Sequence, residues 1–328
     1  MEERLQEVLQ TASRYHVSDI HLTRYPNEPD AVSIEMRING VMKRLKRKKD
    51  DLQFFHYLMY RANLDVSAAM RPQTGSFEEE VGGKILSIRF SIITAGRMMS
   101  GVLRILNQTS GLKVEDLTWD PEMISYLRSI PSYRNGLFVF SGPTGSGKTT
   151  ALYTILNSAE NKRVFTLEDP IEVVNEKFVQ LQVNERQNLS YAEGIKQLMR
   201  HQPDILMIGE IRDSVAAKMA VRCALTGHLV VTSIHSGHCT TAIHRLMDLG
   251  VEQYQLEDVL FGITCQRLYE TGDGRRTAVF ERMSRREVQY YFEHGRNEEG
   301  FRTLEERIEE AVSLGYVSYE DAKADLIV

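Results

Sequence analysis

A glycine-rich stretch that follows a short apolar run has the residue pattern of a phosphate-binding loop. The sequence GPTGSGKT at residues 142–149 fits the pattern GxxxxGKT. It lies between the apolar run LFVF (137–140) and the helix-compatible segment TTALYTILNSA. A strand, this loop and a helix in that order form the context in which the pattern binds phosphate.

The residue types of this loop suit the chemistry of a nucleotide. Glycines let backbone N–H groups turn inward around an anion, and the helix that follows offers its positive N-terminus. The Lys148 ammonium would reach the β- and γ-phosphates, and the Thr149 hydroxyl would bind Mg²⁺. The candidate nucleotide-binding residues are Gly142, Pro143, Thr144, Gly145, Ser146, Gly147, Lys148, Thr149 and Thr150.

Hydrolysis also needs a group that positions water, and PDILMIGEIRD (203–213) supplies a candidate. Glu210 follows a buried strand, and ligands of open α/β sheets lie at the carboxyl ends of strands. Its carboxylate could polarise the attacking water. Many nucleotide hydrolases have Asp just before such a Glu, whereas this chain has Gly209. The contact to magnesium must therefore be indirect or come from another carboxylate. The alternative is a capping or surface residue.

Two further segments follow core strands. TLEDPIE (166–172) places Glu168 and Asp169 after a strand that Pro170 would end, although a solvated loop is the alternative. TGHLVVTSIHSGH (226–238) places His228 and His235 at the two ends of a strand. A histidine there can donate a hydrogen bond to a γ-phosphate, and a merely structural pair is the alternative. Metal ligation is disfavoured because no carboxylate completes a set.

The segments that must hold these residues suggest two domains, since 328 residues is about twice the length of an average one. Residues 1–106 combine strand patterns with apolar helices, which predicts an α+β domain. Residues 107–120 form the predicted linker. Residues 121–328 alternate apolar strands with helices, which predicts an α/β domain whose parallel sheet is covered on both faces. Its charged end, from about residue 283, is predicted to be helical. The first helix has an apolar face of Leu5, Val8, Leu9, Ala12 and Tyr15.

Composition excludes several classes of protein. There are 40 Lys and Arg against 45 Asp and Glu, which leaves a net charge of −5 and disfavours a dedicated duplex-DNA binder. Neither a membrane-spanning run nor a signal peptide is expected. The three cysteines, Cys223, Cys239 and Cys265, contain no CxxC pair, so neither a disulfide framework nor a zinc site is indicated. The sequence therefore predicts a cytoplasmic protein.

Four segments together carry a resemblance to a known family. GPTGSGKTT, TLEDPIE, PDILMIGEIRD and TGHLVVTSIHS, in this order and spacing, resemble the Walker A motif, aspartate box, Walker B motif and histidine box of the secretion-superfamily traffic ATPases. Gly before the catalytic Glu is typical of that family. SDIHL (18–22), RINGV (37–41) and RPQTGSF (71–77) resemble its N-terminal domain, and residues 244–268 and 300–323 resemble its later segments.

The resemblance implies a fold and a set of roles. It implies a RecA-like P-loop ATPase domain preceded by a smaller PAS-like α+β domain. Lys148 and Thr149 would hold ATP and Mg²⁺, and Glu210 would activate water. Glu168 and Asp169 would assist the metal or the water, and His235 would sense the γ-phosphate. Arg89 and Arg104 look like the arginines that close over the phosphates, with ordinary salt bridges as the alternative.

Within the family, the chain most resembles the competence-pseudopilus assembly ATPase of Gram-positive bacteria. Only residues 269–273 separate the QRL segment from Gly274, so the tetracysteine zinc module of many members is missing. The chain also starts close to the SDIHL segment. The resemblance implies a homohexamer at the inner face of the cell membrane, acting on a platform protein and indirectly on pilin-like subunits, with no direct nucleic-acid binding. The alternatives are a pilus retraction or type II secretion ATPase and, from different classes, a nucleic-acid translocase or a nucleotide-switched regulatory protein.

Overall fold

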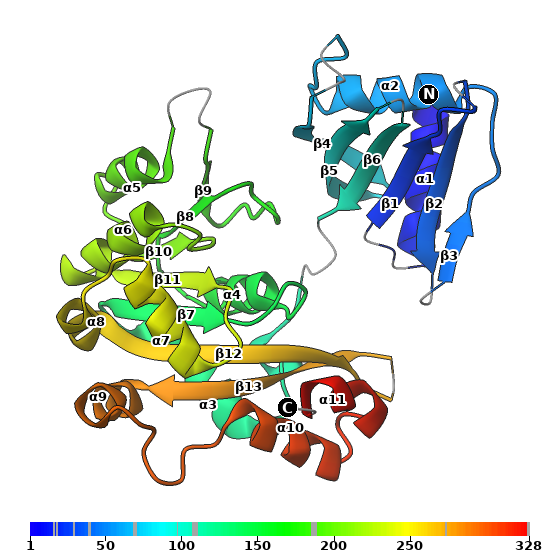
Figure 1. Cartoon of the computed structure of the whole chain (residues 1–328). Coiled ribbons are helices and arrows are strands. Elements are labelled where there is room, and N and C mark those ends of the chain that lie inside the picture. The colour runs from blue at the N-terminus through cyan, green and yellow to red at the C-terminus, as the bar shows by residue number, and fades with distance from the viewer. Residues whose placement is uncertain are drawn as a thin grey trace. The chain divides into compact units, whose positions relative to one another are not determined.

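The computed structural model describes residues 1–15, 17, 19–28, 30–38, 41–67, 71–96, 98–106, 111–184, 189–272 and 274–326. These residues divide into two compact units, one of residues 1–110 with 172–174 and the other of residues 111–171 with 175–328 (Figure 1). The predicted linker begins with residues 107–110, which lie outside the described residues, and its remainder belongs to the second unit.

The first unit is an antiparallel sheet with two helices, as the strand patterns predict. The strands lie in the order β3-β2-β1-β6-β5-β4. The helices are α1 (Glu2–Arg14) and α2 (Asp51–Arg61). The strands are β1 (Asp19–Arg24), β2 (Val32–Ile38), β3 (Val41–Arg44), β4 (Gln73–Val81), β5 (Lys84–Ala95) and β6 (Met98–Ile105). Strand β4 lacks an apolar run, and the sequence pattern did not predict it as a strand.

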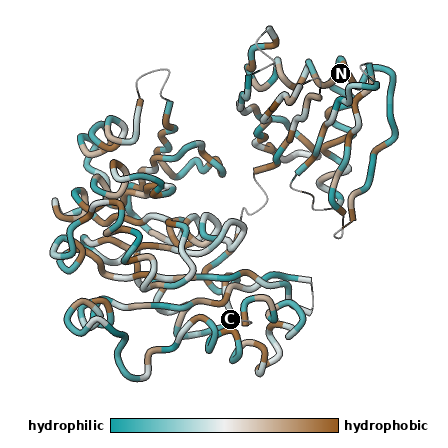
Figure 2. The backbone as a smooth tube through the Cα atoms, viewed as in Figure 1, coloured by the Kyte–Doolittle hydropathy of each residue, from teal (hydrophilic) through white to brown (hydrophobic). Residues whose placement is uncertain are grey.

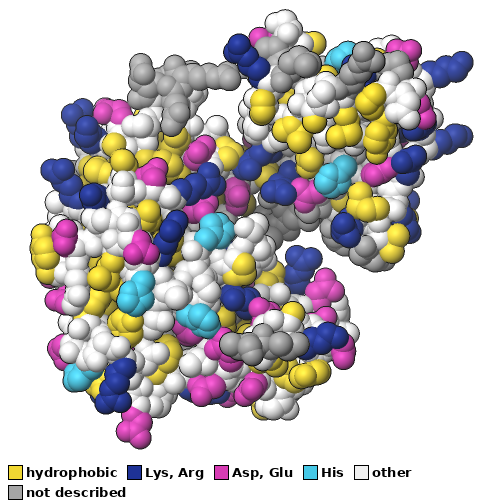
Figure 3. All heavy atoms as spheres, viewed as in Figure 1, with side chains coloured by type: hydrophobic (Ala, Val, Ile, Leu, Met, Phe, Trp, Pro, Cys, Tyr) yellow, Lys and Arg dark blue, Asp and Glu magenta, His cyan; other side chains and the backbone are white. Residues whose placement is uncertain are grey.

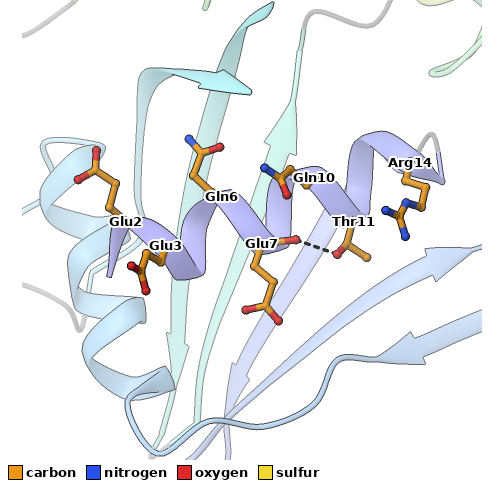
Figure 4. Close-up of a pocket in the computed structure, with 7 residues that line it drawn as sticks. All are labelled: Glu2, Glu3, Gln6, Glu7, Gln10, Thr11 and Arg14. Carbon is orange, nitrogen blue, oxygen red and sulfur yellow. Dashed lines mark hydrogen bonds between the residues drawn. The ribbon is translucent and has the colours of Figure 1, made fainter. Parts of the chain in front are cut away.

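The apolar face of α1 is buried as predicted, with one exception. Leu5, Val8, Leu9 and Ala12 are fully buried, whereas Tyr15 is 47% exposed because the helix ends at Arg14. The opposite face of α1 is polar and lines a surface pocket (Figure 4) with Glu2, Glu3, Gln6, Glu7, Gln10, Thr11 and Arg14. This helix therefore covers the core of its own unit.

Alternation along the strands decides which residues of the first unit lie outside its core. Leu86, Ile88, Phe90 and Ile92 of β5 are buried together with the apolar residues of both helices. Because successive side chains of a strand point to opposite faces, Arg89 lies on the face of the sheet away from this core.

The second unit contains a seven-stranded sheet in the order β13-β12-β7-β11-β10-β8-β9. All neighbouring strands pair in parallel except β12 and β13, which form an antiparallel hairpin. The strands are β7 (Gly136–Ser141), β8 (Val164–Glu168), β9 (Val179–Gln182), β10 (Ile205–Ile208), β11 (Leu229–Ile234), β12 (Leu260–Glu270) and β13 (Arg276–Ser284).

Helices connect these strands, as the sequence pattern predicts. The early ones are α3 (Pro121–Ser129), α4 (Lys148–Asn157), α5 (Tyr191–Met199) and α6 (Ser214–Leu225), with the 3₁₀ turns η1 (Val114–Asp116) and η2 (Ile130–Ser132). The later ones are α7 (Cys239–Asp248), α8 (Gln253–Val259), α9 (Arg285–His294), α10 (Leu304–Ser313) and α11 (Tyr319–Leu326). Helices α9, α10 and α11 form most of the charged end, but residues 283–284 still belong to β13 because they pair with β12.

The central strands of the second unit are completely buried, so polar groups can gather only at their ends. Every residue of β7, β8, β10 and β11 is buried, so both faces of the sheet are covered (Figure 2). Because these strands are parallel, their carboxyl ends meet at one edge, where polar groups can gather.

The outer surface is charged and mixed in sign. Figure 3 shows acidic and basic side chains interspersed over the visible face, in keeping with the small net charge of −5. Among the described residues, no helix is both long enough and apolar enough to cross a membrane.

Candidate nucleotide-binding site

The glycine-rich loop connects β7 to α4. Gly142, Gly145 and Gly147 adopt φ angles of 144°, 82° and 84°, which residues other than glycine rarely adopt. A Cβ atom added to Gly142 would lie 2.6 Å from the backbone oxygen of Gln266. The loop therefore depends on glycine both for its backbone angles and for its close approach to β12.

Lys148 begins α4 and folds back over the loop. Its Nζ donates hydrogen bonds to the backbone oxygens of Gly142, at 2.8 Å, and of Pro143, at 2.9 Å. Pro143, Thr144 and Gly145 are exposed at the rim, whereas Ser146 and Lys148 are buried, and Thr149 and Thr150 are half-buried. The positive end of α4 and a fixed ammonium group thus lie at the same loop, which suits an anion such as a phosphate.

Glu210 lies beside this loop and is connected to it by a histidine. Its Oε1 lies 2.8 Å from Nε2 of His235, and Nδ1 of the same ring lies 3.2 Å from the Gly142 oxygen. Glu210 follows β10 and His235 follows β11, which are neighbouring parallel strands. The sheet therefore brings together three of the segments identified in the sequence.

Arg212 orients the other carboxylate oxygen of Glu210. Its Nε donates a 2.8 Å hydrogen bond to Glu210 Oε2, and its Nη1 lies 3.8 Å from Asp169. Burial lowers the pKa of Arg212, but the hydrogen bond to Glu210 helps to outweigh it, so the net shift is upward. Sequence reasoning missed Arg212, although a cation two residues after a candidate general base is a detectable signal.

The two acidic residues after β8 lie in different surroundings. Glu168 is buried, and its Oε1 accepts 2.7 Å hydrogen bonds from Tyr153 of α4 and from Thr166. Asp169 is half-exposed beside Arg212. Burial, followed by the negative charge of Asp169, raises the pKa of the nearby Tyr191 to about 12. The exposed carboxylate therefore faces the Glu210 side of the site, while Glu168 ties α4 to the sheet.

Packing explains why glycine precedes Glu210. A Cβ atom at Gly209 would lie 3.2 Å from Cγ of Glu168, which is closer than ordinary van der Waals contact. The Gly209 oxygen also accepts a 2.7 Å hydrogen bond from Ser233 of β11. An aspartate at position 209, as other nucleotide hydrolases have it, would therefore press a second carboxylate against the buried Glu168.

Arg89 and Arg104 belong to the first unit, where the structure brings them next to one another. Arg89 of β5 lies directly opposite Arg104 of β6, which lies directly opposite Asp19 of β1. Residues opposite one another share a face of the sheet. Arg104 is about half exposed and donates a 2.6 Å hydrogen bond to Asp19. The two arginines are thus neighbours on one face of the sheet, and Asp19 pairs with Arg104 there.

The remaining histidine and cysteine candidates are separated. His228 and His235 lie at opposite ends of β11, and His228 contacts Thr226 instead of the site. Cys223, Cys239 and Cys265 are buried free thiols. Burial raises the pKa of Cys265 to about 11. In the part of the chain that the structure describes, no cluster of three or more His, Cys, Asp or Glu could hold a metal ion.

Comparison with known sequences identifies relatives along nearly the whole chain. The family described as "Type II/IV secretion system protein" matches residues 1–312. The chain is 31% identical over 326 residues to the competence protein ComGA of Bacillus subtilis (strain 168), covering 92% of this chain and 91% of that protein. It is 32% identical to ComGA of Halalkalibacterium halodurans, covering 97% and 96%. The type II secretion system protein HxcR of Pseudomonas aeruginosa is 35% identical, covering 80% of this chain and 56% of that protein.

Comparison with solved structures agrees on the fold. The pilus retraction motor PilT with bound ADP superimposes with a TM-score of 0.76 at 24% identity, covering 98% of this chain and 96% of that one. The ATPase DotB of Legionella pneumophila also has a TM-score of 0.76, at 20% identity, covering 99% and 96%. These comparisons confirm the resemblance and the fold class predicted from the motifs. The chain therefore belongs to the type II/IV secretion system protein family, the secretion-superfamily traffic ATPases.

Proposed function

We propose that this traffic ATPase is a homohexameric motor that hydrolyses ATP with Mg²⁺ to assemble a competence pseudopilus for DNA uptake. The observation that carries the catalytic part is the chain of contacts from Glu210 through His235 to the Gly142 oxygen of the glycine-rich loop. These contacts bring the Glu210 carboxylate next to the glycine-rich loop, which supports the proposed role of Glu210 as general base. The biological part is supported by the similarity to two proteins named as competence proteins, which extends over nearly the whole length of each chain at 31% and 32% identity.

The residues of the loop fit a nucleotide triphosphate. Backbone N–H groups of residues 142–147 and the start of α4 would hold the phosphates, and Lys148 would move from the loop oxygens to the β- and γ-phosphates. The Thr149 hydroxyl and a carboxylate such as Asp169 are oxygen donors of the kind that Mg²⁺ prefers. The metal would neutralise charge that develops on the phosphates.

His235 would link phosphate binding to water activation. Its Nε2 faces Glu210, and an incoming γ-phosphate would compete for the same N–H group. Once His235 turns to the phosphate, Oε1 of Glu210 becomes available to accept a hydrogen bond from water. Arg212 would keep the carboxylate oriented through Oε2. Glu168 would assist indirectly, by fixing α4 against the sheet.

Arg89 and Arg104 would complete the site when ATP is bound, in the manner of arginine fingers. We expect Arg89→Ala combined with Arg104→Ala to lower kcat about 10³-fold or more, because such fingers contribute that much to phosphoryl transfer. ADP affinity should change little. The control is Arg14→Ala on the polar face of α1 (Figure 4). Steady-state ATP hydrolysis measures kcat. A wild-type kcat in the double variant would mean that the two arginines form only ordinary salt bridges.

In the hexameric ring, ATP hydrolysis would drive movement of one domain relative to the other about the linker at residues 107–120. The motor would act at the inner face of the cell membrane on a platform protein, which would stack pilin-like subunits. No direct nucleic-acid contact is expected. The hairpin from β12 to β13 argues against the members that carry a tetracysteine zinc module, because Glu270 pairs with Arg276 and only residues 271–275 connect the strands. Competence and retraction ATPases both fit this short connection.

The test is made in the parent organism with Lys148→Ala at the native locus. We expect loss of both surface fibres and DNA uptake at normal protein level. Fibres that persist while uptake is lost would point to retraction, the function named for PilT. If both persist, the competence role is wrong, and type II secretion becomes the leading alternative. Salt-sensitive DNA binding that stimulates ATP hydrolysis would instead indicate a nucleic-acid translocase.

A further inference from the structure

The strand β12 runs alongside the glycine-rich loop. It pairs in parallel with β7, and the paired residues end at Cys265 opposite Ser141, the last residue of β7. The next residue of β12, Gln266, is therefore level with the start of the loop. Its side chain is 1% exposed.

Gln266 contacts the loop at three of its residues. Its Nε2 donates a 2.6 Å hydrogen bond to the backbone oxygen of Ser146. Its backbone oxygen lies 2.6 Å from where a Cβ atom of Gly142 would be, and its Nε2 lies 3.4 Å from the corresponding position at Gly147. One buried residue of β12 thus contacts both ends of the loop.

The hydrogen bond to Ser146 bears on phosphate binding through the geometry of the peptide bond. In a trans peptide, the C=O of one residue and the N–H of the next point in opposite directions. Because Gln266 holds the Ser146 oxygen on the β12 side, the N–H of Gly147 points away from β12. A nucleotide phosphate needs such N–H groups as donors.

The side-chain amide of Gln266 is only partly satisfied by hydrogen bonds. Its Oε1 is buried and has no hydrogen-bond partner among the described residues. An unpartnered buried acceptor costs free energy. An apolar side chain would remove this acceptor but would leave the Ser146 oxygen without its donor, so the amide brings little net stability. What distinguishes Gln266 from other buried polar residues of β12 is its direct hydrogen bond to the glycine-rich loop.

We propose that Gln266 is a positioning residue for nucleotide, which holds the Ser146–Gly147 peptide so that its N–H faces the phosphates. This inference rests on the proposed nucleotide binding. It predicts that removal of the amide weakens nucleotide affinity without loss of stability.

The test replaces Gln266 with Met, which has nearly the same length and no N–H donor. We expect the dissociation constant for ADP to rise about tenfold. This corresponds to the loss of roughly one hydrogen bond to a charged ligand, the one from the Gly147 N–H to a phosphate. The melting temperature without nucleotide should stay about equal, because the variant removes the unpartnered Oε1 but leaves the Ser146 oxygen without its donor. The matched control is Thr264→Val, since Thr264 is on the same face of β12, is also 1% exposed, and has an unpartnered Oγ1. That variant should bind ADP as the wild type does.

Each other outcome has a definite meaning. A lower melting temperature or failure to fold in Gln266→Met overturns the proposal, because the amide then serves stability. Unchanged ADP affinity also overturns it, as does an equal loss of affinity in Thr264→Val. If the wild type itself binds neither ADP nor ATP, the proposed function fails. If the wild type binds and hydrolyses ATP while the Met variant matches it, only this inference fails.

Discussion

Replacement of Lys148 by Ala is expected to weaken ATP binding by about 100- to 1,000-fold, which corresponds to two lost hydrogen bonds from a charged donor. The Lys148 ammonium already lies at the loop, bonded to the oxygens of Gly142 and Pro143. A phosphate would replace these neutral acceptors by charged ones, which bind an ammonium more strongly. Titration with a fluorescent ADP or ATP analogue measures the change.

The control for Lys148→Ala is Lys196→Ala on α5. Lys196 is 61% exposed and pairs only loosely with Glu193, at 3.7 Å. Its replacement should leave nucleotide affinity unchanged. Melting temperatures without nucleotide separate lost binding from lost folding. If Lys148→Ala binds ATP within about threefold of the wild type, a difference of less than 1 kcal/mol, Lys148 is not the phosphate ligand.

Replacement of Glu210 by Gln is expected to preserve ATP binding and lower kcat by about 10²- to 10⁴-fold, the contribution typical of a general base. Glutamine has the same shape and can still accept from His235 or Arg212 through its oxygen, but it cannot take a proton from water. A Michaelis constant near that of the wild type, with slow turnover, would identify a role in the chemical step.

Single-turnover hydrolysis is the measurement that separates this role from a role in product release. The matched control is Glu193→Gln on α5, since Glu193 is a partly exposed carboxylate that pairs with Lys196 and Gln197. Hydrolysis at the wild-type rate in Glu210→Gln would refute the assignment of water activation. Asp169, which faces the same arginine, would then be the next candidate to replace.

Several features of this site are predictable from short segments of sequence because their causes are local. The loop of residues 142–149 requires glycines, a lysine and a following helix, and all of these are adjacent in the chain. The fully apolar runs of β7, β8, β10 and β11 predict strands buried on both faces. Parallel pairing then brings the carboxyl ends of β10 and β11 to one edge, where Glu210 and His235 lie in contact.

Other features escaped prediction because they depend on neighbours distant in sequence. Nothing near Gln266 shows that it bonds to Ser146, which is 120 residues earlier in the chain. Strands β4 and β9 have no apolar run, and β13 extends into the predicted helical end because pairing with β12 stabilises it. Tyr15 continues a helical pattern in sequence but lies beyond the end of α1.

The nucleotide-binding loop, the family and the α/β class are predictable from the residues alone, since these depend on residue types at fixed short spacings. Which polar side chains are buried and which are exposed depends on the packing of segments that are distant in sequence. This packing buries Glu168 against Tyr153 and leaves Asp169 beside Arg212, although the two acids are adjacent in sequence. The physical reason is that Glu168 is still part of β8 and packs against α4, whereas Asp169 lies beyond the end of the strand, so tertiary packing sets which carboxylate is buried.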